Sequence, residues 1–405
     1  MDSWQTPLIK VQTTTYGGRG YFALENIPAE TALLTLQTPL TSVIYRAFKK
    51  EVCAYCFAYN MGRPFKIKLV RPVGVNAKVK VKSQAAAYAG LHFCTDACRG
   101  TWVTNYDHQN GLVSETLDCL ETAFAISHKS PEPDLQHIEP CLPVSIITPE
   151  FLEEAWLQLD AFAASTTPSP SSSPALLPQD ITSSTPSLGP TRMAKNQKAK
   201  IPYLDDPEFD AAREIALIVI LNYMAHYHSP TEPTPEFKSL INNFKGQWEV
   251  FQQLQNNELA LLHTFPTLVY SHLKVYQFLA QCLPTQLRPY LTRDIVRTSI
   301  GKDAGNAFGI WELPQSENSE CVGSSIYGLA SFFNHACNPN VLRQRVGRQM
   351  IFKTKMDIQK GDQLNISYGN LVNLERDQRQ KILFDQWHFN CACLKCVQEL
   401  SQIYV

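Results

Sequence analysis

The chain has 405 residues, of which 44% are hydrophobic and 18% are charged, and its formal net charge is −1. This length exceeds the size at which one hydrophobic core stops growing, so we expect two or three compact units. The near-zero charge gives no indication of a global nucleic-acid partner, and the absence of a long apolar run argues against a membrane span. Since the N-terminal residues do not resemble a signal peptide, we expect a protein of the nucleus or cytoplasm.

The first predicted strands lie between residues 8 and 45, and they enclose a glycine-rich turn. In "YGGRGYFA", Gly18, Gly20 and Ala23 have the spacing of a dinucleotide-binding fingerprint. That fingerprint requires a helix directly after the glycines, but Pro28 interrupts this segment, and no acidic residue follows between Thr31 and Lys50. The glycines therefore predict a tight turn between two strands, where the backbone can approach a ligand closely.

Two close cysteine pairs follow this turn, Cys53 with Cys56 and Cys94 with Cys98. Two such pairs separated by a loop are typical of a chain that presents four thiolates to zinc. The alternative is a set of buried thiols, but four chance cysteines in this spacing are improbable. The sequence thus predicts a structural zinc site.

The loop between these pairs is basic and contains no acidic residue. Such a loop can contact nucleic acid or an acidic protein, or it can be plain solvated surface, and the sequence does not decide between these. Its basic residues are Arg63, Lys66, Lys68, Arg71, Lys78, Lys80 and Lys82, so the charged part spans residues 63–82.

The middle of the chain is predicted to be helical. Residues 163–200 contain a tract rich in Ser, Thr and Pro. Because this composition buries little apolar surface, we predict that they form a disordered insertion. After it, Asp206 is a plausible N-cap with Pro207 in the first turn of a helix. Further helical patterns span residues 235–282 and 371–387.

A second group of cysteines lies near the C-terminus, after a segment (321–369) that is predicted to form strands. Cys391, Cys393 and Cys396 supply three thiolates, so a complete zinc site needs a fourth ligand from elsewhere. The most interesting candidate is Cys337, in "FFNHACNPNV".

The segment "SFFNHACNPN" (331–340) resembles the Asn-His-x-Cys-x-Pro-Asn motif of SET-domain protein lysine methyltransferases. Four other segments match the same family in its order along the chain: "GGRG", "GNAFGI" from Gly305, "GDQLNISYGN" with Tyr368, and "FNCACLKC". The cysteine-rich insertion after the first strands is similar to that of the SMYD (SET and MYND) family. The chain resembles a short, fungal-type member of that family.

The resemblance implies an α+β fold, in which a SET domain of short sheets is split by a MYND-like zinc module and a helical insertion. The expected domains are the N-terminal part of the SET domain (1–48), a degenerate MYND-like module (49–112), the helical insertion (113–290), the C-terminal part of the SET domain (291–370) and a post-SET helix and zinc segment (371–405). A complete MYND module binds two zinc ions, but here one of the two ligand sets is missing. Of the His-x-x-x-Cys sequence that ends a complete module, only His108 is present. With Cys337 completing the post-SET site, we expect about two zincs in all.

The resemblance also implies a site for S-adenosylmethionine. Gly18, Arg19, Gly20 and Tyr21 would give backbone contacts to it, Asn334 and His335 would hydrogen-bond its amino-acid and adenine parts with Asn306 and Ser331 nearby, and Phe389 would stack on the adenine. Tyr368 would orient the substrate amine beside the methyl group. Tyr327, Phe332, Phe333 and Trp387 are candidate walls of a lysine channel, and each is equally compatible with ordinary packing.

The function expected from these motifs is methyl transfer from S-adenosylmethionine to a lysine side chain of a protein substrate. The alternative is a catalytically silent SET and zinc scaffold that binds partners through its zinc module or its basic loop. A DNA-binding zinc protein is a third hypothesis, which depends on the basic loop alone. We expect a monomer that acts on an accessible lysine of another protein, with no membrane partner.

Overall fold

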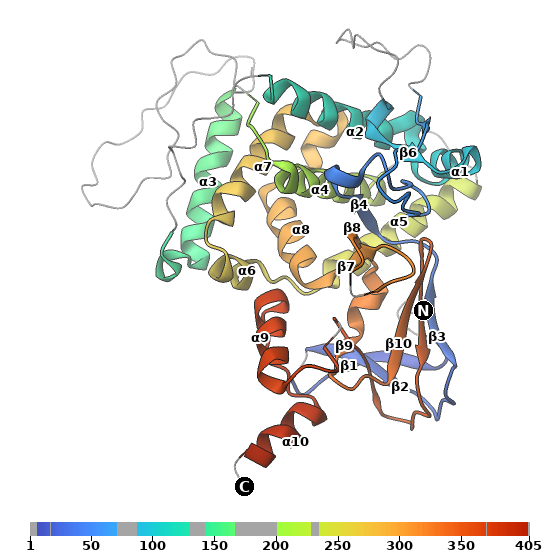
Figure 1. The fold of residues 1–405 in the computed structure, drawn as a ribbon. Helices are drawn as coiled ribbons and strands as arrows, with labels where there is room; N and C mark the ends of the chain where they lie inside the picture. The colour runs from blue at the N-terminus through green and yellow to red at the C-terminus, as the bar shows by residue number, and fades with distance from the viewer. Residues whose placement is uncertain are drawn as a thin grey trace.

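The computed structural model describes residues 6–16, 18–70, 87–129, 142–166, 201–227, 235–316, 318–369 and 371–403. Helices form one half of the molecule, short strands form the other, and the last two helices lie below the helical half, beside the strands (Figure 1). The predicted α+β fold class is therefore confirmed. In the described ranges, no helix has the length and apolar character needed to cross a membrane.

The strands of the described chain form four small sheets. The largest has the order β1–β2–β12–β9, from β1 (Ile9–Thr13), β2 (Arg19–Ala23), β12 (Gln363–Ile366) and β9 (Asn334–His335). Two three-stranded sheets follow, one from β10 (Val341–Val346), β11 (Gln349–Thr354) and β3 (Ala32–Leu36), the other from β4 (Thr41–Ile44), β8 (Cys321–Ile326) and β7 (Ala307–Trp311). A hairpin of β5 (Ile67–Lys68) and β6 (His92–Phe93) belongs to the first cysteine module. Each three-element sheet joins strands from both ends of the chain.

The glycine-rich segment is a turn between two antiparallel strands, as predicted. β1 pairs with β2 in a register that places Thr13 opposite Arg19. Gly18 has φ +69°, a left-handed conformation that costs glycine little, and its carbonyl accepts hydrogen bonds from the Thr14 amide and hydroxyl. No helix follows this turn, so the dinucleotide fingerprint is absent from the fold as well.

Ten helices are described: α1 (Asp96–Tyr106), α2 (His108–Ser127), α3 (Pro149–Thr166), α4 (Asp206–Ala225), α5 (Pro235–Gln253), α6 (Glu258–Thr264), α7 (Leu268–Cys282), α8 (Arg293–Asn306), α9 (Arg376–Trp387) and α10 (Leu394–Ile403). Short 3-10 helices are η1 (Arg46–Phe48), η2 (Tyr88–Gly90), η3 (Val144–Ile146), η4 (Thr285–Tyr290) and η5 (Gly328–Phe332).

Helix α4 is the centre of the helical half, in contact with α2, α5, α7, α8 and β4. It is buried on almost every side, and Ile218 and Val219 are fully buried, each worth about 1.5–3 kcal/mol by transfer from water. The predicted N-cap is wrong by one residue. Asp205 caps the helix, because its side chain accepts the Glu208 amide hydrogen bond while the Glu208 side chain accepts that of Asp205.

Other predicted boundaries differ from the structure in three places. Residues 163–166 belong to α3, so the predicted disordered tract starts too early; its remainder, 167–200, lies outside the described residues. The pattern over 235–282 is three helices, because Pro266 and the Asn256–Asn257 turn interrupt it. Helix α9 begins at Arg376 rather than at 371. The domain limits stay a prediction, and α2 runs across the one placed at residue 112.

Candidate active site and cysteine clusters

The "NHAC" motif begins on a short strand, β9, which contains Asn334 and His335. β9 pairs with β12 in parallel, so that Asn334 lies opposite Asn365 and His335 lies opposite Ile366. The Asn334 side chain crosses to the glycine-rich turn, where its Nδ2 donates to the Arg19 carbonyl at 3.2 Å. Three segments that are far apart in sequence thus meet at one point.

His335 is buried and held by two neighbours. Its Nδ1 accepts a hydrogen bond from the Tyr368 amide at 3.1 Å, and its Nε2 lies 3.4 Å from the Cys337 Sγ. Burial lowers the pKa of His335 to about 4, so the ring is neutral at pH 7. Because Nδ1 accepts, the ring proton is on Nε2 and faces the sulfur. His335 therefore links Tyr368 to the second cysteine cluster.

Tyr368 follows β12, and its hydroxyl donates to the Phe333 carbonyl at 3.2 Å. Its ring lies 5.5 Å from the Trp387 ring and 6.1 Å from the Phe389 ring, measured between centroids. Burial raises the pKa of Tyr368, so its phenol stays protonated at neutral pH. This side chain is suited to orient a neighbouring group and unsuited to accept a proton.

The glycine-rich turn approaches the motif strand so closely that a side chain at Gly20 would have to displace its neighbours. A Cβ on Gly20 would lie 2.7 Å from Asn334 Nδ2 and 2.9 Å from Gln363 Nε2. Arg19 points away from the turn and donates to the Gln253 side chain and carbonyl. Tyr21 is buried in the core against Phe333, so only its backbone faces the turn.

A small cavity of about 30 Å³, room for about one water molecule, lies beside Tyr368. Ser331 faces this cavity, and its buried Oγ has no hydrogen-bond partner in the described part of the chain. Asn306 is held by the carbonyls of Gln255 and Lys302, at 3.0 and 2.7 Å. The cavity is lined by Gly305, Asn306, Ala307, Phe308, Ala330, Ser331, Phe333, Arg343, Tyr368 and Trp387.

Two of the four aromatic residues predicted as channel walls lie at this cavity, and two do not. Phe333 and Trp387 line it. Phe332 instead packs edge-on against Tyr21 and under the Arg19 guanidinium. The hydroxyl of Tyr327 donates to the Arg348 carbonyl at 2.6 Å, in the buried core.

Sequence reasoning missed Arg343, which lies in the same cavity. Its guanidinium lies 5.4 Å from the Phe308 ring centre, and within the described residues it forms no ion pair and no hydrogen bond. Burial lowers its pKa. The sequence pattern that could have identified Arg343 is the alternation of β10, which places Val341 and Arg343 on the same, inward face of the strand. The cavity therefore combines apolar walls with one cation.

The second cysteine cluster joins the motif to the C-terminal segment, as predicted. The four sulfurs of Cys337, Cys391, Cys393 and Cys396 lie within 4.8 Å of one another, and all four residues are buried. The Sγ of Cys337 is 3.9 Å from that of Cys391 and 3.5 Å from that of Cys396. Zn–S bonds of about 2.3 Å in a tetrahedron place sulfurs about 3.8 Å apart, so this set fits a zinc ion.

Two side chains of α9 that the sequence did not single out hold this cluster in place. Gln380 donates to the Cys391 carbonyl and accepts from its amide, both at 2.7 Å. Arg379 is buried, contacts the Cys396 Sγ at 3.5 Å and is ion-paired with Glu399. A buried cation beside four thiolates offsets part of their negative charge. Helix α9 ends at Trp387 and is capped by His388 in a left-handed conformation. The chain then turns to present Phe389, whose ring lies 6.2 Å from that of His335.

The first cysteine cluster lies in the module at the opposite end of the fold. The sulfurs of Cys53, Cys56, Cys94 and Cys98 also lie within 4.8 Å of one another. Those of Cys56 and Cys94 are 3.5 Å apart, and those of Cys94 and Cys98 are 3.4 Å apart. This set also fits a tetrahedral metal ion. The His108 side chain and residues 71–86, which carry most of the basic loop, lie outside the described residues.

Comparison with known proteins agrees with this geometry. The SET domain family model matches residues 18–369. A protein of Saccharomyces cerevisiae named "Potential protein lysine methyltransferase SET6" is 29% identical over 409 residues, 98% of this chain and 97% of the relative. A SET and MYND domain-containing protein of Dictyostelium discoideum is 38% identical over 25% of this chain and 24% of its own. The human histone-lysine N-methyltransferase SMYD3 is 32% identical over 22% and 20%.

Proposed function

This chain belongs to the SET domain family, and on that premise we propose that it is a protein-lysine N-methyltransferase that uses S-adenosylmethionine. The names of its relatives in yeast and human support lysine methylation. The observation that carries the proposal is the meeting of Asn334, His335 and Tyr368 beside the glycine-rich turn. A catalytically silent scaffold would not need a buried tyrosine hydroxyl at this point.

The residues at the turn fit the cofactor. At Gly20 the missing Cβ lets the side-chain amides of Asn334 and Gln363 lie directly against the backbone of the turn, so polar groups gather there. The buried Gln363 Nε2 has no hydrogen-bond partner in the described chain, and neither has Ser331 Oγ. These unsatisfied polar atoms are what a polar ligand would pair with. When bound, S-adenosylmethionine supplies an electrophilic methyl group on a sulfonium.

The chain's own residues would then position a lysine amine in its neutral form. The Tyr368 hydroxyl stays protonated, and the hydroxyl and the Phe333 carbonyl lie at the cavity where the amine would be oriented. Apolar walls and the Arg343 guanidinium both disfavour a second positive charge there, so they lower the pKa of the amine. Catalysis would be mostly orientation and exclusion of water.

The proposal is tested with the full chain, labelled S-adenosylmethionine and a protein extract or histones as substrate. We expect label transfer to protein, and binding of S-adenosylhomocysteine by calorimetry that is lost in Asn334→Ala. The control is Asn60→Ala, in the first cysteine module, which should leave both unchanged. A folded protein that neither binds S-adenosylhomocysteine nor transfers label would establish the scaffold function instead.

A further inference from the structure

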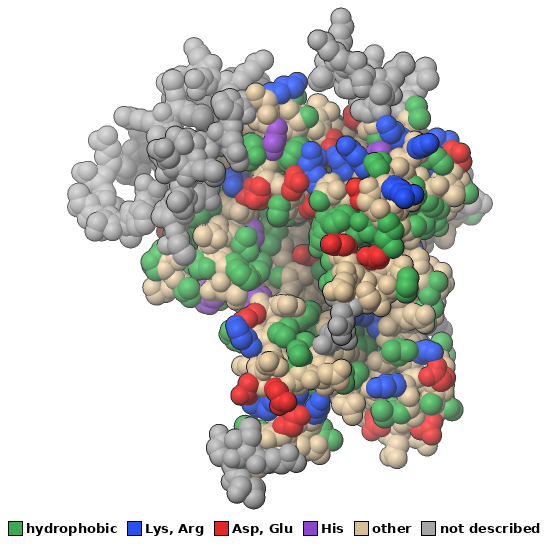
Figure 2. All heavy atoms as spheres, in the orientation of Figure 1, with side chains coloured by type: hydrophobic (Ala, Val, Ile, Leu, Met, Phe, Trp, Pro, Cys, Tyr) green, Lys and Arg blue, Asp and Glu red, His purple; other side chains and the backbone are tan. Residues whose placement is uncertain are grey.

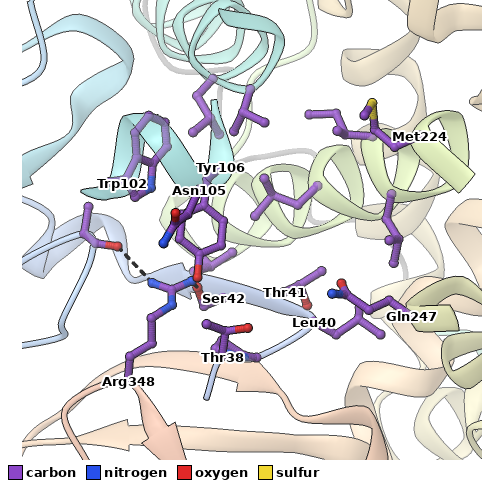
Figure 3. Close-up of a pocket in the computed structure, with 18 of the residues that line it drawn as sticks. Thr38, Leu40, Thr41, Ser42, Trp102, Asn105, Tyr106, Met224, Gln247 and Arg348 are labelled. Carbon is purple, nitrogen blue, oxygen red and sulfur yellow. Dashed lines mark hydrogen bonds between the residues drawn. The ribbon is translucent and has the colours of Figure 1, made fainter. Parts of the chain in front are cut away.

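A second and larger cavity, of about 410 Å³, lies outside the methyl-transfer site (Figure 3). This is within the range of small-molecule pockets, roughly 300–1,000 Å³. It is enclosed by β4 and the segment before it, by α1 and α2 of the cysteine module, and by α4 and α5 of the helical half. None of the residues assigned to the cofactor or the amine lines it.

One end of this cavity is polar and centred on Arg348, in the turn between β10 and β11. The guanidinium Nη1 donates to the carbonyls of Ala54 and Tyr55, at 3.3 and 2.8 Å. Its second nitrogen, Nη2, lies 3.4 Å from the hydroxyl of Ser42. Figure 3 shows the Tyr106 hydroxyl pointing toward this guanidinium, which lies 4.4 Å from the centre of the Tyr106 ring.

The charge of Arg348 is not neutralised by the described residues. No carboxylate of the described chain forms an ion pair with it, and its buried Nε has no hydrogen-bond partner. The other cation in the lining, Arg213, is paired with Asp210 and the Ile44 carbonyl. A half-buried guanidinium without a counter-ion is costly, so this end of the cavity favours an anion.

The other end of the cavity is apolar. Leu221 and Met224 of α4 are buried there, and Leu217 of the same helix and Phe244 of α5 add partly buried apolar surface. Figure 3 places Met224 at the far side of the cavity from Arg348. A ligand that satisfies both ends has one anionic group and an apolar body.

We propose that this cavity binds a small amphipathic carboxylate, such as a medium-chain acyl carboxylate, with its carboxylate on Arg348 and its apolar body along α4. A single guanidinium that lacks a counter-ion among the described residues, beside the hydroxyls of Ser42 and Tyr106, suits the one negative charge of a carboxylate better than a phosphate, since the lining contains no lysine. Because the cavity lies between the cysteine module, the strands and the helical half, the bound ligand holds all three together and raises the stability of the chain.

The test uses the full chain with decanoate below its micelle concentration and decanol as the uncharged match. We expect decanoate to raise the Tm and, by calorimetry, to bind at least about tenfold more tightly than decanol, as expected for a hydrogen bond to a charged group. In Arg348→Gln this preference should vanish while decanol binding remains. In Leu217→Trp, which fills the apolar end, both ligands should bind at least about tenfold more weakly.

Arg345→Gln is the matched control, because Arg345 donates to the carbonyls of Gly347 and Trp311 and does not line the cavity. Equal binding of decanoate and decanol to the wild type would overturn the proposal, as would a preference that survives Arg348→Gln. Failure of both to bind would overturn it as well. If Arg348→Gln does not fold, Leu217→Trp alone decides whether the ligands occupy this cavity. None of these measurements depends on methyl transfer.

Discussion

Tyr327 is a buried and Tyr368 a partly buried tyrosine of the strand half, and they differ in what surrounds the hydroxyl. The Tyr368 hydroxyl lies at the cavity beside the motif strand, whereas that of Tyr327 is bonded to the Arg348 carbonyl inside the core. Only the first is placed to touch a substrate. The same chemical change at the two positions should therefore have opposite consequences for activity and stability.

We predict that Tyr368→Phe lowers the methyl-transfer rate by about a hundredfold or more, because the group that orients the amine is lost. Binding of S-adenosylhomocysteine should change little, as measured by calorimetry. Tyr327→Phe, the control, should keep the rate while it lowers the free energy of unfolding by about 1 kcal/mol through the loss of one hydrogen bond. A Tyr368→Phe variant with an unchanged rate would remove Tyr368 from the mechanism.

Arg343 should act through its charge on the substrate amine. A cation close to the amine lowers its pKa, so Arg343→Met should raise the pKa of the bound amine and move the ascending limb of the kcat–pH profile upward by about one pH unit. The control is Arg345→Met, on the same strand but outside the cavity. Profiles that coincide for Arg343→Met and the wild type would show that the charge does not reach the amine.

At the scale of elements, the contact between α4 and α8 contains two buried carboxyl groups that face each other, from Glu214 and Asp303. They lie at a cavity of about 550 Å³, and Figure 2 shows the molecule hollowed on the face where α8 lies. Burial raises the pKa of Asp303 to about 6, and burial together with Asp303 raises the pKa of Glu214. Thr41 donates to Glu214 at 3.3 Å.

The sign of the resulting pH dependence follows from these directions. An aspartate that titrates near 3.9 when unfolded and near 6 when folded stabilises the fold at low pH, and this contribution is lost as the pH rises from about 4 to about 6. Glu214→Gln removes a second carboxyl whose pKa is raised in the fold, so the variant lacks that group's share of the loss. We therefore expect the free energy of unfolding of the variant, relative to the wild type, to increase as the pH rises from about 4, by about 1–3 kcal/mol at pH 7, with a higher relative Tm.

Thermal unfolding between pH 4 and pH 8 measures this difference. Glu249→Gln, on the exposed side of α5, is the control and should give a constant difference from the wild type. A Glu214→Gln curve that runs parallel to the wild type would mean that the pair does not resist ionisation in the fold.

At the scale of the whole molecule, the two cysteine clusters belong to different parts of the core. The first packs with α1, α2 and the rest of the helical half, whereas the second packs with α9 and Tyr368. The second also includes Cys337, two residues from His335, so it fixes the motif strand directly. The clusters should therefore be separable by their effects on the cofactor site.

We predict that Cys98→Ala and Cys396→Ala each lose one zinc per chain, by elemental analysis, and that each lowers the Tm. Only Cys396→Ala should also lose S-adenosylhomocysteine binding, because its cluster holds Asn334 and His335 in place. A protein that folds with no zinc would contradict both metal assignments. Equal loss of cofactor binding in the two variants would contradict their independence.

The sequence alone determined the family, the turn at Gly18 and the grouping of eight cysteines into two sets, because each depends on residues in a fixed local order. Asn334, His335 and Cys337 were found together since one short sequence motif carries all three, and its first two residues form β9. Helix α4 was found from its apolar pattern, although its cap was misplaced by one residue between two adjacent aspartates.

Only the tertiary structure decided which distant side chains meet. Arg343 enters the cavity beside Tyr368 because β10 turns that face inward, and Gln363 reaches Gly20 because β12 pairs with β2. The Arg348 cavity exists only where the cysteine module, the strands and the helices come together. Periodicity and spacing report local conformation, whereas these sites depend on the packing of segments that are tens to hundreds of residues apart, which no local pattern encodes.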